Sequence, residues 1–226
     1  MHPLTPLLSI TLLAAAAAPT LQAYERNPSG DADMRVALTV DLLPDTSDLT
    51  LSTSNDSQEY EDEDWDDAWR VGVDFTSQRL LSEEGGPYLA YGIGLYYNYY
   101  NVESDDSNAE LTNEGYMLQP HVGIGMHATE WLFLSGNAYG EIGMATFDYS
   151  AENPLGDDID EESDSEFSYG YGIYGQADFA LGEKVVLGAR VGWMAQELEG
   201  DLEDIDLTIE SSTDGLFYGL TAGVRF

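Results

Sequence analysis

The last segment of the chain alternates between two kinds of residue with a period of two. One parity carries Leu216, Tyr218, Leu220, Ala222, Val224 and Phe226. The other parity carries Phe217, Gly219, Thr221, Gly223 and Arg225. Because successive side chains of a strand point to opposite faces, this segment predicts a strand with one apolar face and one face of mainly small or polar residues.

The same alternation recurs along the chain and predicts eight strands. They lie near residues 34–43, 68–78, 87–101, 116–128, 131–148, 167–179, 185–196 and 216–226. The links near 79–86, 128–130 and 181–184 are short, whereas those near 45–67, 103–114, 150–166 and 197–214 are long. This organisation is typical of an outer-membrane β-barrel. We therefore expect an all-β, antiparallel, up-and-down transmembrane barrel of eight strands. Residues 48–54 also alternate, which leaves ten strands as an alternative.

A soluble β-sandwich is the competing fold, because it too contains many alternating strands. It would bury the apolar parity and expose the parity of glycine and arginine to water. Glycine interleaved with arginine suits a narrow barrel lumen better, since an eight-stranded barrel is just wide enough inside for side chains. The inward glycines would leave room for large neighbours such as Tyr96 and Tyr174. A lumen packed in this way is not a general diffusion pore.

The chain resembles the small eight-stranded outer-membrane barrels of Gram-negative bacteria, the class of OmpA and OmpX. The motif-like part of the resemblance is the ending, residues 216–226, which finishes on an aromatic carboxyl-terminal residue. The resemblance implies a monomer in the outer membrane, in contact with lipid and lipopolysaccharide. It also implies that the barrel-assembly machinery recognises the terminal strand, with Tyr218 and Phe226 as the assembly signal.

The amino terminus has the pattern of an export signal. Residues 7–18 form an apolar run of twelve, which is too short to span a bilayer as a helix. Ala23 follows at a plausible cleavage position, although no Lys or Arg precedes the run. We expect a secretory signal peptide over residues 1–23 and a barrel domain over residues 24–226.

Acidic residues dominate the charge of the chain. Its 226 residues include 43 Asp and Glu against 7 Lys and Arg, a formal net charge of −36. This charge excludes a nucleic-acid-binding protein, which needs a basic surface. Because cysteine is absent, disulfides, thiolate zinc sites and cysteine nucleophiles are excluded as well.

The four long links hold 31 of the 43 acidic residues and contain no Lys or Arg. One interpretation is solvation, since dense like charge keeps exposed segments soluble and extended. A second is weak binding of divalent cations by runs such as 61–64 and 157–162, which lack the glycine and spacing of an EF-hand. A third is recognition of a basic partner. With both termini at the periplasmic side, these links would face the exterior.

The inward parity carries most of the few basic residues. The predicted lumen charge network comprises Arg35, Asp41, Arg70, Asp74, Glu141, Asp178, Arg190 and Arg225. Buried charges are costly unless they are paired and hydrogen-bonded, and the planar arginine fork suits pairing with carboxylates. We expect Asp41 to pair with Arg70, and Arg190 to pair with Glu141.

Outward aromatic residues are predicted to form two interfacial girdles, as in membrane barrels. The outer girdle comprises Tyr97, Tyr99, Tyr169, Tyr171, Trp193 and Tyr218, and the inner one comprises Phe179 and Phe226.

Catalytic chemistry is weakly represented. His121 and His127 share one strand and one parity, but six residues of strand place them about 20 Å apart, too far for one metal ion. His127 could approach Ser135 across a short turn, with Glu141 further along the same strand. No cofactor or metal is expected. The sequence predicts a non-enzymatic barrel with a structural or surface-interaction role. The alternatives are a narrow, porin-like, cation-preferring channel and an outer-membrane lipid or peptide hydrolase.

Overall fold

The computed structural model describes residues 33–44, 46–53, 57–64, 67–81, 86–104, 109–152, 158–163, 165–202 and 207–226. The predicted signal peptide, residues 1–23, lies outside the described residues, as does Asp157 of the second acidic run. No helix in the described ranges is long and apolar enough to cross a bilayer.

The described chain forms eleven strands. They are β1 (Asp33–Leu42), β2 (Thr46–Thr53), β3 (Ser57–Asp64), β4 (Asp67–Leu80), β5 (Tyr88–Ser104), β6 (Ala109–His127), β7 (Leu132–Glu152), β8 (Asp158–Glu162), β9 (Glu166–Leu181), β10 (Val185–Leu202) and β11 (Leu207–Arg225). Every pairing between them is antiparallel.

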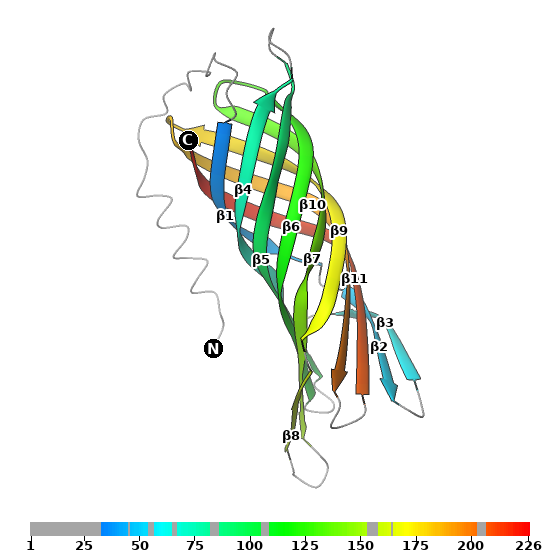
Figure 1. The fold of residues 1–226 in the computed structure, drawn as a ribbon. Coiled ribbons are helices and arrows are strands. Elements are labelled where there is room, and N and C mark those ends of the chain that lie inside the picture. Colours follow the sequence, from blue (N-terminus) through cyan, green and yellow to red (C-terminus); the bar gives the residue numbers. More distant parts are fainter. Residues whose placement is uncertain are drawn as a thin grey trace.

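Eight of these strands close into a ring, so the predicted eight-stranded barrel is confirmed (Figure 1). The order is β1, β4, β5, β6, β7, β9, β10 and β11, and β11 pairs with β1 to complete the circle. The short turns and the carboxyl terminus lie at one end, which we call the turn end, and the long hairpins lie at the opposite, outer end.

The stagger of the ring sets its width. Directly paired residues on successive strands form a row around the ring. If the register of β1 with β11 is continued by one residue, a row that starts at Asp33 returns to β1 at Leu43, ten residues further along the strand. The row passes through Gln78, Ala90, Gly123, Asn137, Tyr174, Gly192 and Phe217. With a rise of about 3.3 Å per residue and about 4.8 Å between strands, this stagger tilts the strands by about 40° and gives a radius of about 8 Å. Side chains fill a space of that radius.

The sequence predicted loops for the long acidic links, but their described residues mostly form strands that continue the sheet. β2 follows β1 in the same register against β11, since Leu42 faces Tyr218 and Asp48 faces Ser212. The break between them lies at Pro44, which has no backbone N–H to donate to a ladder. β3 then pairs with β2, and β8 pairs with β7.

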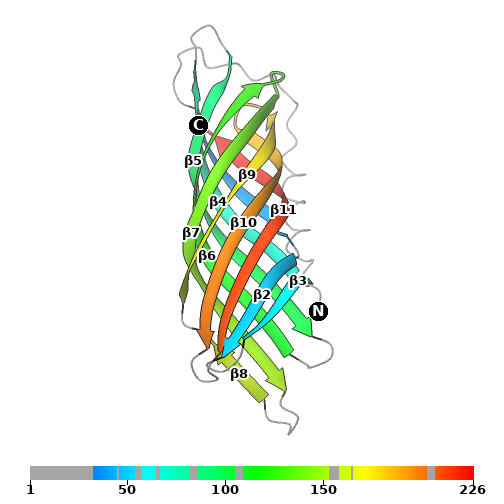
Figure 2. The same ribbon diagram turned by 90° about the vertical axis from the view of Figure 1, so that its right-hand side faces the viewer.

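The ten-strand alternative is therefore wrong for the ring, although residues 46–53 do form a strand (Figure 2). Beyond the ring, the sheet continues as two groups of strands, with β2 and β3 beside β11 and with β8 beside β7.

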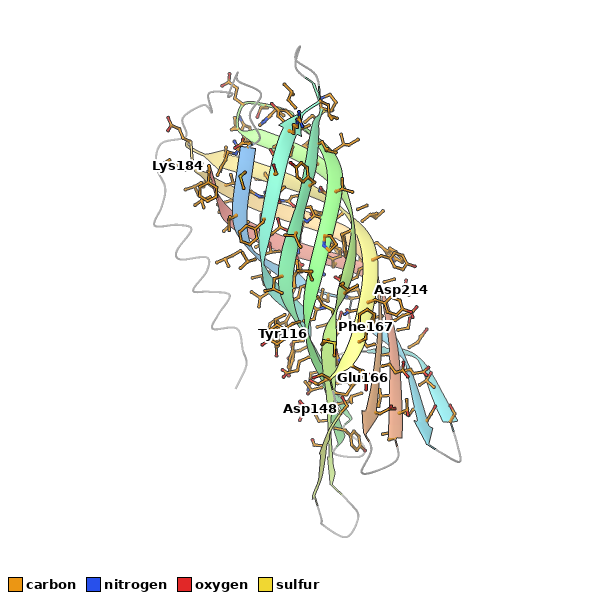
Figure 3. The ribbon with its side chains drawn as sticks, viewed as in Figure 1. Tyr116, Asp148, Glu166, Phe167, Lys184 and Asp214 are labelled. Carbon is orange, nitrogen blue, oxygen red and sulfur yellow. The ribbon has the colours of Figure 1, made fainter. Side chains whose placement is uncertain are left out.

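The outer surface of the ring is apolar and its aromatic residues gather at two levels. The outer level includes Trp69, Tyr97, Tyr99, Tyr116, Phe167, Tyr169, Tyr171 and Trp193, whose rings neighbour one another in pairs. At the turn end, Trp131 stacks on Phe179. Figure 3 shows Lys184 at the turn end, with Tyr116 and Phe167 nearer the outer end and Asp148 beyond them. The fold is that of a membrane-spanning barrel, with an apolar wall between aromatic levels.

Candidate functional site

The centre of the lumen is an ion-pair cluster in which two arginines share one carboxylate. The Nε of Arg70 donates to Asp41 Oδ2, while Arg190 donates to Asp41 Oδ1 through Nε at 2.7 Å and to Oδ2 through Nη2. Asp41 and Arg70 are directly opposite each other on β1 and β4. Between Asp41 and Arg190 lies Gly219 of β11, where a Cβ would collide with the Asp41 carboxylate.

Glu141 completes the cluster from β7. Arg70 Nη1 donates to Glu141 Oε2 at 3.3 Å, and Gln119 Nε2 donates to the same oxygen at 3.1 Å. The predicted pair of Arg190 with Glu141 is wrong, because the acid partner of Arg190 is Asp41. The physical reason is Gly219, whose missing side chain lets Asp41 reach across β11 to Arg190.

Aromatic rings enclose both guanidinium groups. The Arg70 Cζ atom lies 4.9 Å from the ring centroids of Tyr96 and Phe217 and 5.8 Å from that of Tyr139. The Arg190 Cζ atom lies 5.3 Å from Tyr96, 5.4 Å from Tyr174 and 5.7 Å from Phe217. Such cation–π contacts are strongest where water is excluded, as here. Sequence reasoning did not single out Tyr139 and Phe217, although both are large residues on the inward parity.

A second group of polar side chains lies nearer the turn end. Arg35 Nη1 is 2.6 Å from Asp178 Oδ2, and Arg225 Nε is 3.2 Å from Asp33 Oδ2. Asp74 accepts hydrogen bonds from Thr76 Oγ1 at 2.5 Å and from Tyr96 at 3.3 Å. All eight charged residues predicted for the lumen are at most 8% exposed; they are Arg35, Asp41, Arg70, Asp74, Glu141, Asp178, Arg190 and Arg225.

The outer part of the lumen contains a cluster of apolar side chains, which the sequence did not predict, beside buried polar residues such as Asn98, Asn113 and Gln196. A plug of buried side chains comprises Leu43, Tyr100, Leu111, Met117, Phe147, Met194, Leu198 and Ile209. We call it the outer plug. Phe147 of β7 lies so close to Gly200 of β10 that a Cβ there would collide with the ring, so the plug joins β7 to β10, the two strands on either side of β9. The plug was missed because several of its residues lie in segments that were assigned to loops.

A cavity of about 10 Å³ lies on the turn side of the cluster, among residues that include Arg35, Thr76, His121, Tyr174 and Asp178. It has room for about one water molecule. In the described part of the chain, charged and aromatic side chains fill the centre of the lumen, and the outer plug lies between them and the outer end.

The residues considered for catalysis are engaged elsewhere. His127 packs edge-on against Tyr88 and Phe133, with ring centroids 5.4 and 5.1 Å apart. The Oγ atom of Ser135 accepts a hydrogen bond from Asn137 Nδ2 at 3.1 Å, and Glu141 is bound to Arg70. Within the described ranges, no group of three or more His, Asp or Glu residues could hold a metal ion.

The carboxyl-terminal aromatic residue lies on the outer surface at the turn end. Phe226 is 73% exposed and its backbone N–H donates to the carbonyl of Met34 at 2.9 Å. We expect Phe226→Ser to reduce the folded fraction several-fold in cells, because the resemblance makes this residue part of the assembly signal. Heat-modifiable migration of the membrane fraction measures the folded form. Phe179→Ser, at the same level, is the matched control, and equal losses in both variants would contradict a signal role.

Comparisons with known proteins address the fold. No protein-family model matches the chain, and neither does any curated protein. Among solved structures, the outer membrane protein OprG of Pseudomonas aeruginosa is similar over 86% of this chain and 95% of its own, with 12% identity and a TM-score of 0.45. The outer membrane protease OmpT of Escherichia coli covers 92% of this chain and 99% of its own, with 10% identity and a TM-score of 0.43. Ail of Yersinia pestis, solved with a heparin analogue, covers 87% of this chain and 99% of its own, with 14% identity and a TM-score of 0.31. At such low identities and TM-scores, the assignment of the fold rests on the ring of eight strands in this chain.

Proposed function

We propose that the protein is a monomeric, non-enzymatic barrel of the bacterial outer membrane with a structural or surface-interaction role. The observation that supports this proposal most is the filled lumen. Arg70 and Arg190 occupy its centre with Asp41, and the outer plug lies above them. A barrel closed in this way anchors its outer end in the membrane rather than conducting solutes.

The outer end is the surface through which such a barrel would interact. It is strongly acidic, and it includes a depression with a volume of about 470 Å³ that is lined by residues of β9, β10, β11 and β2. This depression is lined by the acidic residues Asp48, Glu197, Glu199 and Glu210 and by the aromatic residues Phe167 and Tyr169. Negative potential of this density favours basic partners and weakly attracts divalent cations. Lipopolysaccharide and the barrel-assembly machinery are the further partners that the resemblance implies.

Planar-bilayer recording tests the proposal. We expect the purified protein to show no sustained conductance, because buried side chains of Arg70, Arg190 and Phe217 fill the centre of the lumen. A variant in which Arg70, Arg190 and Phe217 are all replaced by alanine serves as the comparison, since it removes the central obstruction. Stable, cation-selective steps from the unmodified protein would contradict the proposal and favour a narrow channel.

Lipid and peptide profiles of cells test the non-enzymatic part. We expect cells that express the unmodified protein and cells that express Ser135→Ala or His127→Ala to give the same profile. The reason is that Ser135 is hydrogen-bonded to Asn137 and His127 packs against Phe133. A product that appears with the unmodified protein and disappears with both variants would favour a hydrolase.

A further inference from the structure

The depression of about 470 Å³ at the outer end, which we call the acidic depression, is built on paired strands. Its strands β10, β11 and β2 lie side by side there (Figure 2). Tyr169 of β9 is directly opposite Glu197 of β10, which is directly opposite Ser212 of β11. Two residues further outward, Glu199 of β10 is directly opposite Glu210 of β11. Aromatic rings thus lie at one side of the acidic depression, and carboxylates lie across its centre.

Two of these carboxylates repel each other. Side chains directly opposite on antiparallel strands have Cβ atoms about 5 Å apart, and like charges so placed destabilise a sheet. Glu199 and Glu210 are both exposed, and neither forms an ion pair with a described residue. The described basic residues lie elsewhere, with Arg79 and Lys184 at the turn end and the others in the lumen. An arrangement that folding does not favour is typical of a functional site.

Two exposed aromatic rings border the carboxylates. Phe167 and Tyr169 stack on each other, with ring centroids 6.3 Å apart and an interplanar angle of 28°. The Tyr169 hydroxyl donates a hydrogen bond to Glu197, which holds the ring beside the carboxylates. An exposed ring face attracts a cation and offers apolar surface to the alkyl stem that carries it. The acidic depression therefore combines negative charge with apolar contact.

This combination fits an organic cation better than a metal ion. Among the residues that the structure describes, no group of three or more His, Asp or Glu could hold a metal ion. An ammonium group needs no such cage, because its three N–H donors can bridge two carboxylates while its stem lies on a ring. Glu199 and Glu210 supply the two carboxylates, and Phe167 and Tyr169 supply the rings.

The spacing of the carboxylates favours an extended peptide. Glu197 and Glu199 lie on one face of β10, about 6–7 Å apart along the strand. Alternate residues of an extended peptide have the same spacing and the same side. Two lysines separated by one residue can therefore reach Glu197 and the pair of Glu199 and Glu210 together. Two adjacent lysines point to opposite sides, so only one of them faces the sheet.

We propose that the acidic depression binds an extended basic segment of another protein, through two lysine or arginine side chains separated by one residue. The charged groups contact Glu197, Glu199 and Glu210, and the alkyl stems contact Phe167 and Tyr169. The inference rests on the proposed surface-interaction role and names the chemistry of the partner.

Binding of a fluorescent peptide to the folded protein in a zwitterionic detergent tests this site. The probe is Ser-Lys-Ser-Lys-Ser with blocked ends and an uncharged dye, and its fluorescence anisotropy is measured at about 0.15 M salt. We expect saturable binding at a single site. Glu199→Gln/Glu210→Gln should weaken the affinity about tenfold, as expected for the loss of two exposed ion pairs. Phe167→Ala should weaken it about threefold, through the lost contact between cation and ring.

A matched variant and a matched peptide control for general attraction between opposite charges. Glu110→Gln/Glu114→Gln removes the same charge from β6, on the other side of the ring, and should leave the affinity unchanged. The peptide Ser-Ser-Lys-Lys-Ser has the same charge as the probe and should bind less tightly, because only one of its lysines faces the sheet.

Equal losses in the two double variants, or equal affinities of the two peptides, would overturn the proposal. Spermidine that displaces the probe at a lower concentration than the unlabelled peptide would overturn it in favour of a free polyamine. Calcium that does so would overturn it in favour of a metal ion. Mass spectrometry of the recovered peptide separates the site from the proposed function. A bound peptide that is cleaved would support the site and contradict the non-enzymatic role, whereas an intact peptide that does not bind would contradict the site alone.

Discussion

Asp41→Ala should lower the free energy of unfolding by about 3–5 kcal/mol, because it removes the carboxylate shared by two buried guanidinium groups. Arg70 would keep Glu141 as a partner at 3.3 Å, whereas Arg190 would lose both of its hydrogen bonds to an acid. Urea unfolding in phospholipid vesicles, followed by heat-modifiable migration, measures the loss. Asp214→Ala is the matched control, since Asp214 is an exposed residue on β11 (Figure 3).

A charge-balanced variant separates the ion pair from the space it fills. Asp41→Leu/Arg190→Met removes one acid and one base together and leaves Arg70 paired with Glu141. We expect it to be more stable than Asp41→Leu alone, because replacing a whole buried pair with apolar side chains costs less than leaving one charge without its partner. If the double variant were the less stable of the two, the cluster would not be held by charge pairing.

Phe147→Ala should destabilise the barrel by about 3–5 kcal/mol, the usual cost of removing a fully buried aromatic ring. Phe147 is 0% exposed in the outer plug, and its ring covers Gly200 of β10, two strands away in the ring. The same urea experiment measures the change. Phe167→Ala deletes the same side chain from a site that is 59% exposed on the outer surface, so its effect should be much smaller. Equal effects would show that the Phe147 ring does not hold β7 and β10 together.

The eight ring strands could be predicted because their two faces meet different surroundings. Outward positions such as Leu220 and Val224 face hydrocarbon, and inward positions such as Thr221 and Arg225 share the lumen. Residue type therefore alternates along each strand, and the sequence alone shows this alternation. The inward parity of the charged residues follows from the same alternation.

The partner of Arg190 could not be predicted, because it depends on the stagger of strands that are distant in sequence. A shift of one residue in the register of β1 against β11 would put Val40 or Leu42, rather than Asp41, opposite Gly219. Glycine at position 219 carried a signal, since a missing side chain between two charged residues leaves them room to meet.

The strands β3 and β8 were missed, and β2 was only an alternative, for another reason. Their acidic residues have low β-propensity, and composition favoured loops. Pairing with the neighbouring strands β11 and β7 overrides that preference.

The orientation of the alternating faces is the central claim, and single-cysteine labelling along β11 tests it most directly. The chain contains no cysteine, so each variant carries one label only. In phospholipid vesicles, spin labels at Leu220 and Val224 should collide readily with oxygen dissolved in the hydrocarbon, and labels at Thr221 and Gly223 should be shielded from it. Labels at Leu220 and Val224 that are shielded from oxygen, while Thr221 is reached by a water-soluble reagent, would contradict a membrane-spanning barrel.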